Sequence, residues 1–219
     1  GGPQRPSLII PRKFPPRRAR PTATMPPLPP LTQALMLACT AAYFGGLLLR
    51  NSIPLEYWFA LWPIGTGLFR PWQLLTYAFL HGSFTHLLFN MLGLWMFGSE
   101  LERLWGRRRY GEFLIAGALT AALAQLVFTA IAGSPAPTVG ASGALYALLL
   151  AYGMLFPNRT VMLLIPPIPM KARTFVIVFG TLELLFGLSG SSGIAHFAHL
   201  GGMLGGWLMI RWWRGQPPF

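Results

Sequence analysis

The chain has 219 residues, of which 53% are hydrophobic and only 10% are charged. A soluble domain usually carries about 25% charged residues, so this composition excludes an ordinary water-soluble fold and indicates a protein with several membrane spans. The formal net charge is +12, and all five acidic residues are glutamates. The lack of aspartate excludes a Ser-His-Asp triad, an aspartyl dyad and any aspartate-based metal site. The single cysteine, Cys39, excludes an internal disulfide and a thiolate metal cluster.

Residues 1–30 differ in composition from the rest of the chain. They are rich in proline and carry six Lys and Arg residues with no acidic residue. Such a segment cannot bury a core, and we expect a flexible tail. A position beside anionic lipid on the cytoplasmic face suits its charge, and we expect no nucleic-acid partner. A basic, acid-poor start also resembles an organellar presequence.

Apolar blocks separated by short breaks fill residues 31–214 and predict one all-α membrane domain. A helix needs about 20 residues to cross the core of a bilayer. The first connection, 51–80, is rich in Trp and Pro, which predicts an irregular element at the membrane interface. A proline-rich stretch, 157–170, joins the fourth and fifth blocks. The six predicted transmembrane helices cover 31–50, 83–103, 109–132, 142–156, 171–188 and 194–213.

The distribution of basic residues predicts the orientation of these six spans. If the N-terminus is inside, only Arg50 and Arg70 of the 17 Lys and Arg residues fall on the outside. Basic residues concentrate on the cytoplasmic side of membrane proteins. We therefore expect both termini in the cytoplasm and an even number of spans.

Polar residues at the start of the second predicted span need an explanation, because such residues are costly inside a membrane. His86 and Asn90 are four residues apart and share one helix face. Both side chains can donate hydrogen bonds toward one point, or they can form a polar clamp between helices. A solute pathway lined by His81, His86 and His199 is a third reading. It would require repeated, broken helices, and the chain has no internal repeat.

A small-residue motif, Gly140-Ala-Ser142-Gly143, opens the fourth predicted span. Ser142 would lie at a helix N-terminus, where free amides and the helix dipole favour negative charge. An oxyanion that forms beside Ser142 could use those amides. The motif also suits simple helix packing, and Ala144 distinguishes it from the G-x-S-x-G elbow of soluble hydrolases.

Two overlapping G-x-x-x-G pairs follow His199 in the sixth predicted span. They are Gly201 with Gly205 and Gly202 with Gly206, and such pairs allow another helix to approach closely. The fourth span has a matching stripe of small residues that begins at Gly143. Close contact of these faces would bring His199 within hydrogen-bond reach of Ser142, and a serine nucleophile needs such a base. A packing role for His199 remains open.

The glutamates carry no catalytic signal in the sequence. Glu100 and Glu102 lie at the inner end of the second span, where capping and pairing with local arginines is the expected role. Glu183 lies in the fifth span, and nothing in the sequence links it to His199. We therefore assign Glu183 no catalytic role.

Together these motifs resemble the rhomboid family of intramembrane serine proteases, over about residues 31–213. The resemblance implies a nucleophile at Ser142 and a general base and acid at His199. It implies oxyanion donors at His86 and Asn90, and a tyrosine, Tyr146, that stacks on the catalytic histidine. Positions 81, 102 and 202 also match structural residues of the family. The first connection lacks the usual Trp-Arg pair of the family.

The resemblance implies an endopeptidase that cleaves transmembrane segments of single-span or multi-span membrane proteins in the lipid bilayer. The reaction would use a Ser-His dyad and an acyl-enzyme, with no cofactor and no metal. The chain also lacks the H-E-x-x-H motif of zinc proteases. A catalytically silent rhomboid-like protein that binds transmembrane segments is the alternative. The expected location is a bacterial inner membrane.

Overall fold

The computed structural model describes residues 27–162, 167–189 and 195–215. The predicted basic tail therefore lies almost wholly outside the described residues. The helices and strands are α1 (Pro30–Leu49), α2 (Leu55–Phe59), η1 (Ile64–Thr66), α3 (Gln73–Thr76), η2 (Tyr77–Phe79), α4 (Phe84–Gly93), η3 (Leu94–Gly98), α5 (Ser99–Ala132), α6 (Ser142–Leu155), β1 (Thr160–Met162), β2 (Pro169–Lys171), α7 (Ala172–Ser189) and α8 (His196–Trp213).

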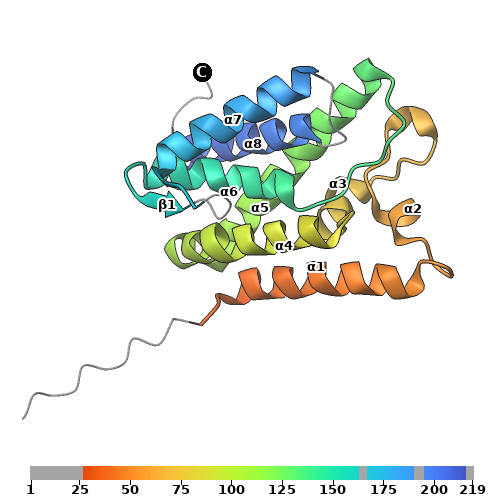
Figure 1. Cartoon of the computed structure of the whole chain (residues 1–219), viewed down its shortest axis with the longest axis horizontal. Helices are drawn as coiled ribbons and strands as arrows, with labels where there is room; N and C mark the ends of the chain where they lie inside the picture. The colour runs from red at the N-terminus through yellow and green to blue at the C-terminus, as the bar shows by residue number, and fades with distance from the viewer. Residues whose placement is uncertain (1–26, 163–166, 190–194, 216–219) are drawn as a thin grey trace, which may run out of the picture.

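The long helices form a bundle with α1 at one edge and α7 and α8 at the other (Figure 1). Helix α5 packs against α8, α6 and α1, and α6 packs against α8. Helices α4, α6 and α8 all begin at the same end of the bundle (Figure 1). The structure thus brings the polar starts of these three helices to one end of the molecule.

The predicted all-α membrane fold is confirmed. Helix α1, the segment Phe84–Ala132 and helix α7 are long and apolar enough to cross a membrane, and α6 is a shorter apolar helix. The 49-residue segment Phe84–Ala132 includes the second and third predicted spans. Gly106 interrupts this segment with φ 77° and ψ 162°, and Gly98 faces the Tyr110 ring beyond the interruption. The total of six spans remains a prediction.

Helices α1 and α7 expose most of their apolar surface. In each, only 11% of the most apolar 18-residue stretch is buried inside the protein. A soluble protein would not leave such large apolar faces uncovered, whereas lipid chains cover them without cost. These two helices therefore form the outer edges of a multi-pass membrane protein.

Two connections between the helices differ in character. The first, between α1 and α4, is irregular as predicted and contains only short helical segments. The proline-rich stretch contains a small hairpin that the sequence did not predict. Its strands β1 and β2 pair antiparallel, with Val161 opposite Met170.

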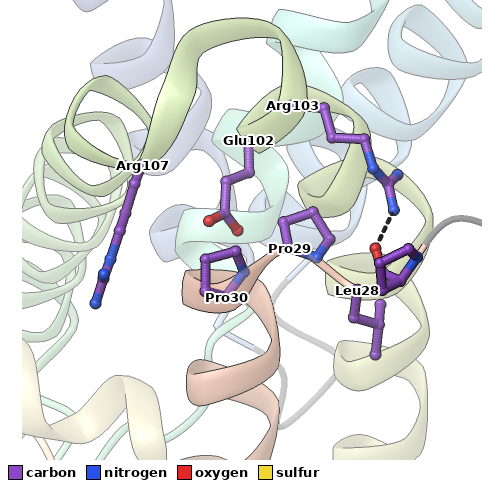
Figure 2. A pocket seen from close by; sticks show the side chains of 7 residues that line it. Leu28, Pro29, Pro30, Glu102, Arg103 and Arg107 are labelled. Atoms are coloured by element: carbon purple, nitrogen blue, oxygen red, sulfur yellow. Dashed lines mark hydrogen bonds between the residues drawn. The ribbon is translucent and has the colours of Figure 1, made fainter.

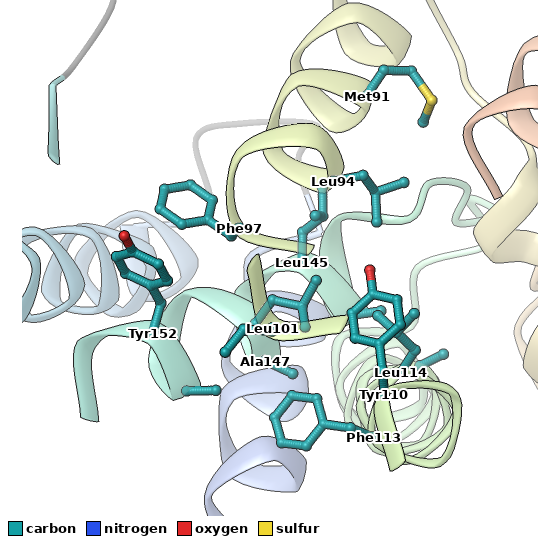
Figure 3. Packing of buried hydrophobic residues seen from close by; sticks show 14 of the residues in the cluster. Met91, Leu94, Phe97, Leu101, Tyr110, Phe113, Leu114, Leu145, Ala147 and Tyr152 are labelled. Carbon is teal, nitrogen blue, oxygen red and sulfur yellow. The ribbon is translucent and has the colours of Figure 1, made fainter. Parts of the chain in front are cut away.

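The hydrophobic core lies where α4, η3, α5 and α6 meet (Figure 3). Tyr110, Phe113 and Leu148 are among its fully buried side chains. The π-helical turn η3 contributes Leu94 and Phe97 to the core. Such turns often occur near functional sites, and Phe97 also lines the cavity described below.

Glu102 anchors α1 to the core. Its carboxylate accepts hydrogen bonds from the Leu31 amide at 2.9 Å and from the Thr32 amide and hydroxyl at 2.7 Å each. Figure 2 shows this carboxylate facing the start of α1, beside a shallow hollow of about 440 Å³. Glu102 therefore caps a helix that is distant in sequence. Free amides at a helix N-terminus favour such a negative charge.

The expected pairing of Glu100 with local arginines is wrong. Glu100 pairs with Arg159, which lies beyond α6, and accepts a hydrogen bond from Tyr152 at 3.1 Å. The glutamate is thus used to join the end of α6 to the start of α5. Tertiary packing, which sequence spacing does not encode, selects this partner.

Candidate active site

Ser142 and His199 lie in contact at the end of the bundle where α6 and α8 begin. The distance between His199 Nε2 and Ser142 Oγ is 2.8 Å. Ser142 is the first residue of α6, and His199 lies in the first turn of α8. His199 is only 7% exposed. The pair therefore has the geometry of a nucleophile with its general base.

Small residues allow α6 and α8 to come this close. A Cβ atom added at Gly202 would overlap the Gly143 backbone, with the Gly143 carbonyl carbon only 2.7 Å away. One turn later, a Cβ at Gly206 would lie 3.1 Å from the Ala147 Cα. The predicted contact between the two small faces is therefore confirmed for this pair of glycines.

The other glycine pair faces a different helix. A Cβ atom at Gly201 would lie 2.7 Å from the Thr120 carbonyl oxygen of α5, and a Cβ at Gly205 would meet the Thr120 side chain. One glycine pair thus seats α8 on α6 and the other seats it on α5. Together they fix both the position and the rotation of the helix that carries His199.

Tyr146 lies one turn after Ser142 and covers the face of the His199 ring. The two ring centroids are 4.2 Å apart and the ring planes differ by 8°. The Tyr146 hydroxyl donates a hydrogen bond to Glu183 Oε1 on α7. The tyrosine therefore restrains the plane of the histidine ring and links it to a third helix.

Glu183 is a site residue that sequence reasoning missed. Its Oε2 atom lies 2.9 Å from His199 Nδ1 and 2.6 Å from His196 Nδ1. The sequence carried no signal that links Glu183 to His199, and the structure places the two side chains in contact. An acidic residue in an apolar helix was a visible signal, but the rotation of α7 that aims it at His199 depends on tertiary packing.

Glu183, His196 and His199 also offer atoms that could bind a metal. Their potential ligand atoms lie within 4.8 Å of one another. An ion bound there would compete for the nitrogen through which His199 contacts Glu183. Ser-His chemistry needs no metal, and the absence of a cofactor stays an expectation from the sequence.

His86 and Asn90 lie on α4 and line the same cavity as Ser142. The Asn90 side-chain amide donates a hydrogen bond to the His86 carbonyl oxygen at 2.8 Å. The His81 and His86 rings pack edge to face, with their centroids 5.1 Å apart. His81 lies before α4, and burial, together with the charge of His86, lowers the pKa of His81 to about 4. His81 is therefore neutral at physiological pH.

Gly140 keeps a space open between His86 and Ser142. Its φ of 123° is a conformation that residues with a side chain rarely adopt. A Cβ atom there would lie 2.6 Å from His86 Cε1 and 3.6 Å from Ser142 Oγ. The missing side chain therefore leaves a space between the His86 ring and Ser142 at the start of α6.

A cavity of about 1010 Å³ contains these groups. Ser142, Tyr146 and His199 line it together with His86 and Asn90. Phe89 of α4, Phe175 and Phe179 of α7, and residues 134 and 136–139 form apolar and loop parts of its wall. A cavity of this size, with a few polar groups in an apolar lining, is typical of a binding site.

The structure thus brings together all five residues singled out from the sequence: Ser142, His199, His86, Asn90 and Tyr146. It adds Glu183 and His196 from α7 and α8.

Comparison with known proteins identifies the family. The rhomboid domain model matches residues 69–214. Rhomboid protease GluP of Bacillus subtilis (strain 168) is 37% identical over 137 residues, which are 62% of this chain and 24% of the relative. Rhomboid protease GlpG of Yersinia pestis (strain Pestoides F) is 31% identical over 188 residues, which are 84% of this chain and 62% of the relative. The same identity and coverage hold for rhomboid protease GlpG of Yersinia pseudotuberculosis serotype O:3 (strain YPIII). The chain thus spans less than two thirds of the length of these relatives, and its matched segment belongs to the rhomboid family.

Proposed function

We propose that the protein is an intramembrane serine endopeptidase that cleaves transmembrane segments of membrane-embedded proteins. The observation that carries the proposal is the 2.8 Å contact between Ser142 Oγ and His199 Nε2, inside a cavity of about 1010 Å³. The relatives named rhomboid protease GluP and GlpG support the same activity. The likeness covers most of this chain but only part of those proteins.

The reaction begins when Ser142 Oγ attacks a peptide carbonyl carbon. His199 Nε2 takes the hydroxyl proton as the new carbon–oxygen bond forms, and then gives it to the leaving amine. An acyl-enzyme remains on Ser142. A water molecule, deprotonated by His199, attacks this ester, and His199 returns the proton to Ser142 Oγ as the second product leaves.

The oxyanion of each tetrahedral intermediate lies near the space beside Gly140. The Ser142 amide is free there because it belongs to the first turn of α6. The His86 ring and the second proton of the Asn90 side-chain amide supply further donors. Loss of one oxyanion donor costs about 3–4 kcal/mol in the activation barrier of serine hydrolases.

The substrate segment must unwind before it can react. Helical peptide groups bond internally within a membrane, so the scissile carbonyl becomes available only where the substrate helix opens. We expect small or helix-destabilising residues near the cleavage site, because they open a helix most easily. Single-span and multi-span membrane proteins are both candidate substrates.

The basic residues support an orientation with both termini in the cytoplasm. In a bacterial inner membrane, the starts of α4, α6 and α8 would then face the outside. Water would reach Ser142 from that side.

An electrophilic serine probe tests the proposal. A fluorophosphonate should label the purified protein at Ser142, and Ser142→Ala should abolish labelling without lowering the thermal midpoint. Labelling requires an activated nucleophile, so a wild-type protein that stays unlabelled would favour a silent rhomboid-like protein that only binds transmembrane segments.

A further inference from the structure

Glu183 is buried in the middle of a helix that is otherwise largely exposed. Glu183 is only 8% exposed. It lies on α7, a helix with an outer apolar face. A carboxylate in such surroundings is costly unless hydrogen-bond donors surround it. The Tyr146 hydroxyl and His196 Nδ1 hydrogen-bond to it, and His199 Nδ1 lies 2.9 Å from it. Packing alone does not require this arrangement.

We propose that Glu183 is the positioning residue of the active site, which holds His199 through Nδ1 so that Nε2 faces Ser142 as a base. The proposal rests on the proposed function of Ser142 and His199. The two contacts of the ring are 2.9 Å from Nδ1 to Glu183 Oε2 and 2.8 Å from Nε2 to Ser142 Oγ. The three side chains therefore form a continuous Ser-His-Glu line across α6, α8 and α7.

The contact fixes the tautomer of His199. A neutral imidazole carries its proton on one nitrogen and a lone pair on the other. A carboxylate oxygen beside Nδ1 selects the form with the proton on Nδ1, which leaves the Nε2 lone pair facing the Ser142 hydroxyl. The N–H is not yet aimed directly at the oxygen. Catalytic hydrogen bonds often align only when substrate is bound.

Glu183 also stabilises the charge that forms during the reaction. When the Ser142 proton moves to Nε2, the ring becomes an imidazolium, and the adjacent carboxylate favours that charge. The proton stays on His199 until it moves to the leaving amine, and Glu183 itself gains no proton. In a low-dielectric site this attraction is stronger than in water.

Two neighbours hold the carboxylate in place. The Tyr146 hydroxyl bonds to Oε1, while His196 Nδ1 lies 2.6 Å from Oε2. Tyr146 therefore acts twice, because its ring stacks on His199 and its hydroxyl restrains the group that faces the edge of the same ring. His196 acts on the carboxylate through this contact with Oε2.

Glu183→Gln is the direct test, because it keeps the size of the side chain and removes its charge. We expect kcat to fall by at least about 100-fold with little change in KM, since loss of the orienting carboxylate costs up to about 10⁴-fold in a serine protease. The acidic limb of the pH profile of kcat/KM should move to lower pH, because His199 loses a charge that favours its protonated form. Glu112→Gln is the matched control, since Glu112 forms a surface pair with Arg108, and it should change neither quantity.

Two further measurements separate positioning from simple structural support. Glu183→Asp keeps the negative charge on a shorter side chain, and its kcat should be at least about tenfold higher than that of Glu183→Gln. Proton–nitrogen-15 correlation spectra should show a downfield proton on His199 Nδ1 in the wild-type protein and in Glu183→Asp. This downfield signal should be lost in Glu183→Gln. If Glu183→Gln fails to fold, Glu183→Asp and Tyr146→Phe carry the same spectroscopic test.

The outcomes distinguish this proposal from the proposed function. Three results would overturn the positioning role of Glu183. They are a kcat of Glu183→Gln within about threefold of wild type, a pH profile that does not move in this variant, and a proton on Nε2 of His199 in the wild-type protein. A wild-type protein with the Nδ1 proton bonded to Glu183 but no cleavage or probe labelling would instead refute the proposed function and leave the positioning role of Glu183 supported.

Discussion

Gly202→Val should destroy the catalytic pair by pushing α8 away from α6. Gly202 lies one turn after His199, and Gly143 directly follows Ser142, so this close approach of the two helices is adjacent to the reacting atoms. Even the first carbon of the new side chain would lie 2.7 Å from the Gly143 carbonyl carbon. No rotamer of valine relieves this overlap, because it involves Cβ itself.

The magnitude follows from these distances. Carbon atoms pack at about 3.5–4.0 Å, so the helices must separate by about 1 Å at Gly202. A similar shift at His199 would lengthen the 2.8 Å contact with Ser142 to almost 4 Å, beyond the reach needed for proton transfer. We expect a loss of about 100-fold or more in kcat/KM and a destabilisation of about 1–3 kcal/mol from overpacking.

Cleavage, fluorophosphonate labelling and the thermal midpoint should be measured together for Gly202→Val and the milder Gly202→Ala. Gly45→Val is the matched control, because it makes the same change in a helix where a new Cβ meets nothing within 4 Å. It should leave labelling unchanged. Full activity in Gly202→Val, with the protein folded, would show that this contact does not set the distance between Ser142 and His199.

Three other changes probe separate parts of the structure. His199→Ala should abolish cleavage, whereas His196→Ala should reduce it by about tenfold or less, because His199 lies 2.8 Å from the Ser142 hydroxyl while His196 acts on the Glu183 carboxylate; steady-state cleavage rates compare them. Glu102→Ala should lower the free energy of unfolding by about 1–3 kcal/mol through the lost cap of α1, measured by the thermal midpoint, while the probe still labels Ser142 below that midpoint. Burial lowers the pKa of His81 from 6.5 to about 4, so between these pH values the unfolded state binds more protons than the folded state. The free energy of unfolding should therefore fall as pH falls from 6.5 to about 4. Thermal melts of His81→Gln should show a flatter dependence of stability on pH in this window.

Each of these expectations has a contrary result. An inactive His196→Ala with an active His199→Ala would reverse the assignment of the base. A Glu102→Ala protein with an unchanged midpoint would show that its hydrogen bonds to α1 add no net stability. A slope of stability against pH that is the same with and without His81 would assign the acid sensitivity to other groups.

Much of the site could be predicted because local motifs carry it. The placement of Ser142 at a helix start and of His199 beside paired glycines follows from spacing, since small residues permit close helix contact, whereas the roles of these residues were expected from the resemblance to the rhomboid family. The sequence could not show which glycine pair faces which helix. That division depends on the rotation of α8, with Gly202 toward Gly143 and Gly201 toward Thr120.

Long-range polar contacts were the part that sequence reasoning missed. Glu183, Glu102 and Glu100 all meet partners from segments that are distant in the chain. An acidic residue in a membrane helix signals a function or a buried partner. The identity of that partner depends on how the helices are rotated and packed, which the periodicity of a single helix does not encode.

The helix bounds were predicted more closely than the connections. The structure has α6 at Ser142–Leu155 and α7 at Ala172–Ser189, within a residue or so of the expected spans, because apolar blocks end at Pro and Gly. The hairpin of β1 and β2 was not expected, since three-residue strands that include Pro169 have no clear alternating pattern.

The most direct test of proteolysis is cleavage of defined substrates by the reconstituted protein. Wild-type and Ser142→Ala proteins should be incorporated into liposomes with a panel of single-span substrates, and the products identified by mass spectrometry. We predict that the wild-type protein cuts inside or beside the membrane segment of at least one substrate, near small or helix-destabilising residues, and that Ser142→Ala yields none of these products. The same products at the same rate from Ser142→Ala would contradict the account.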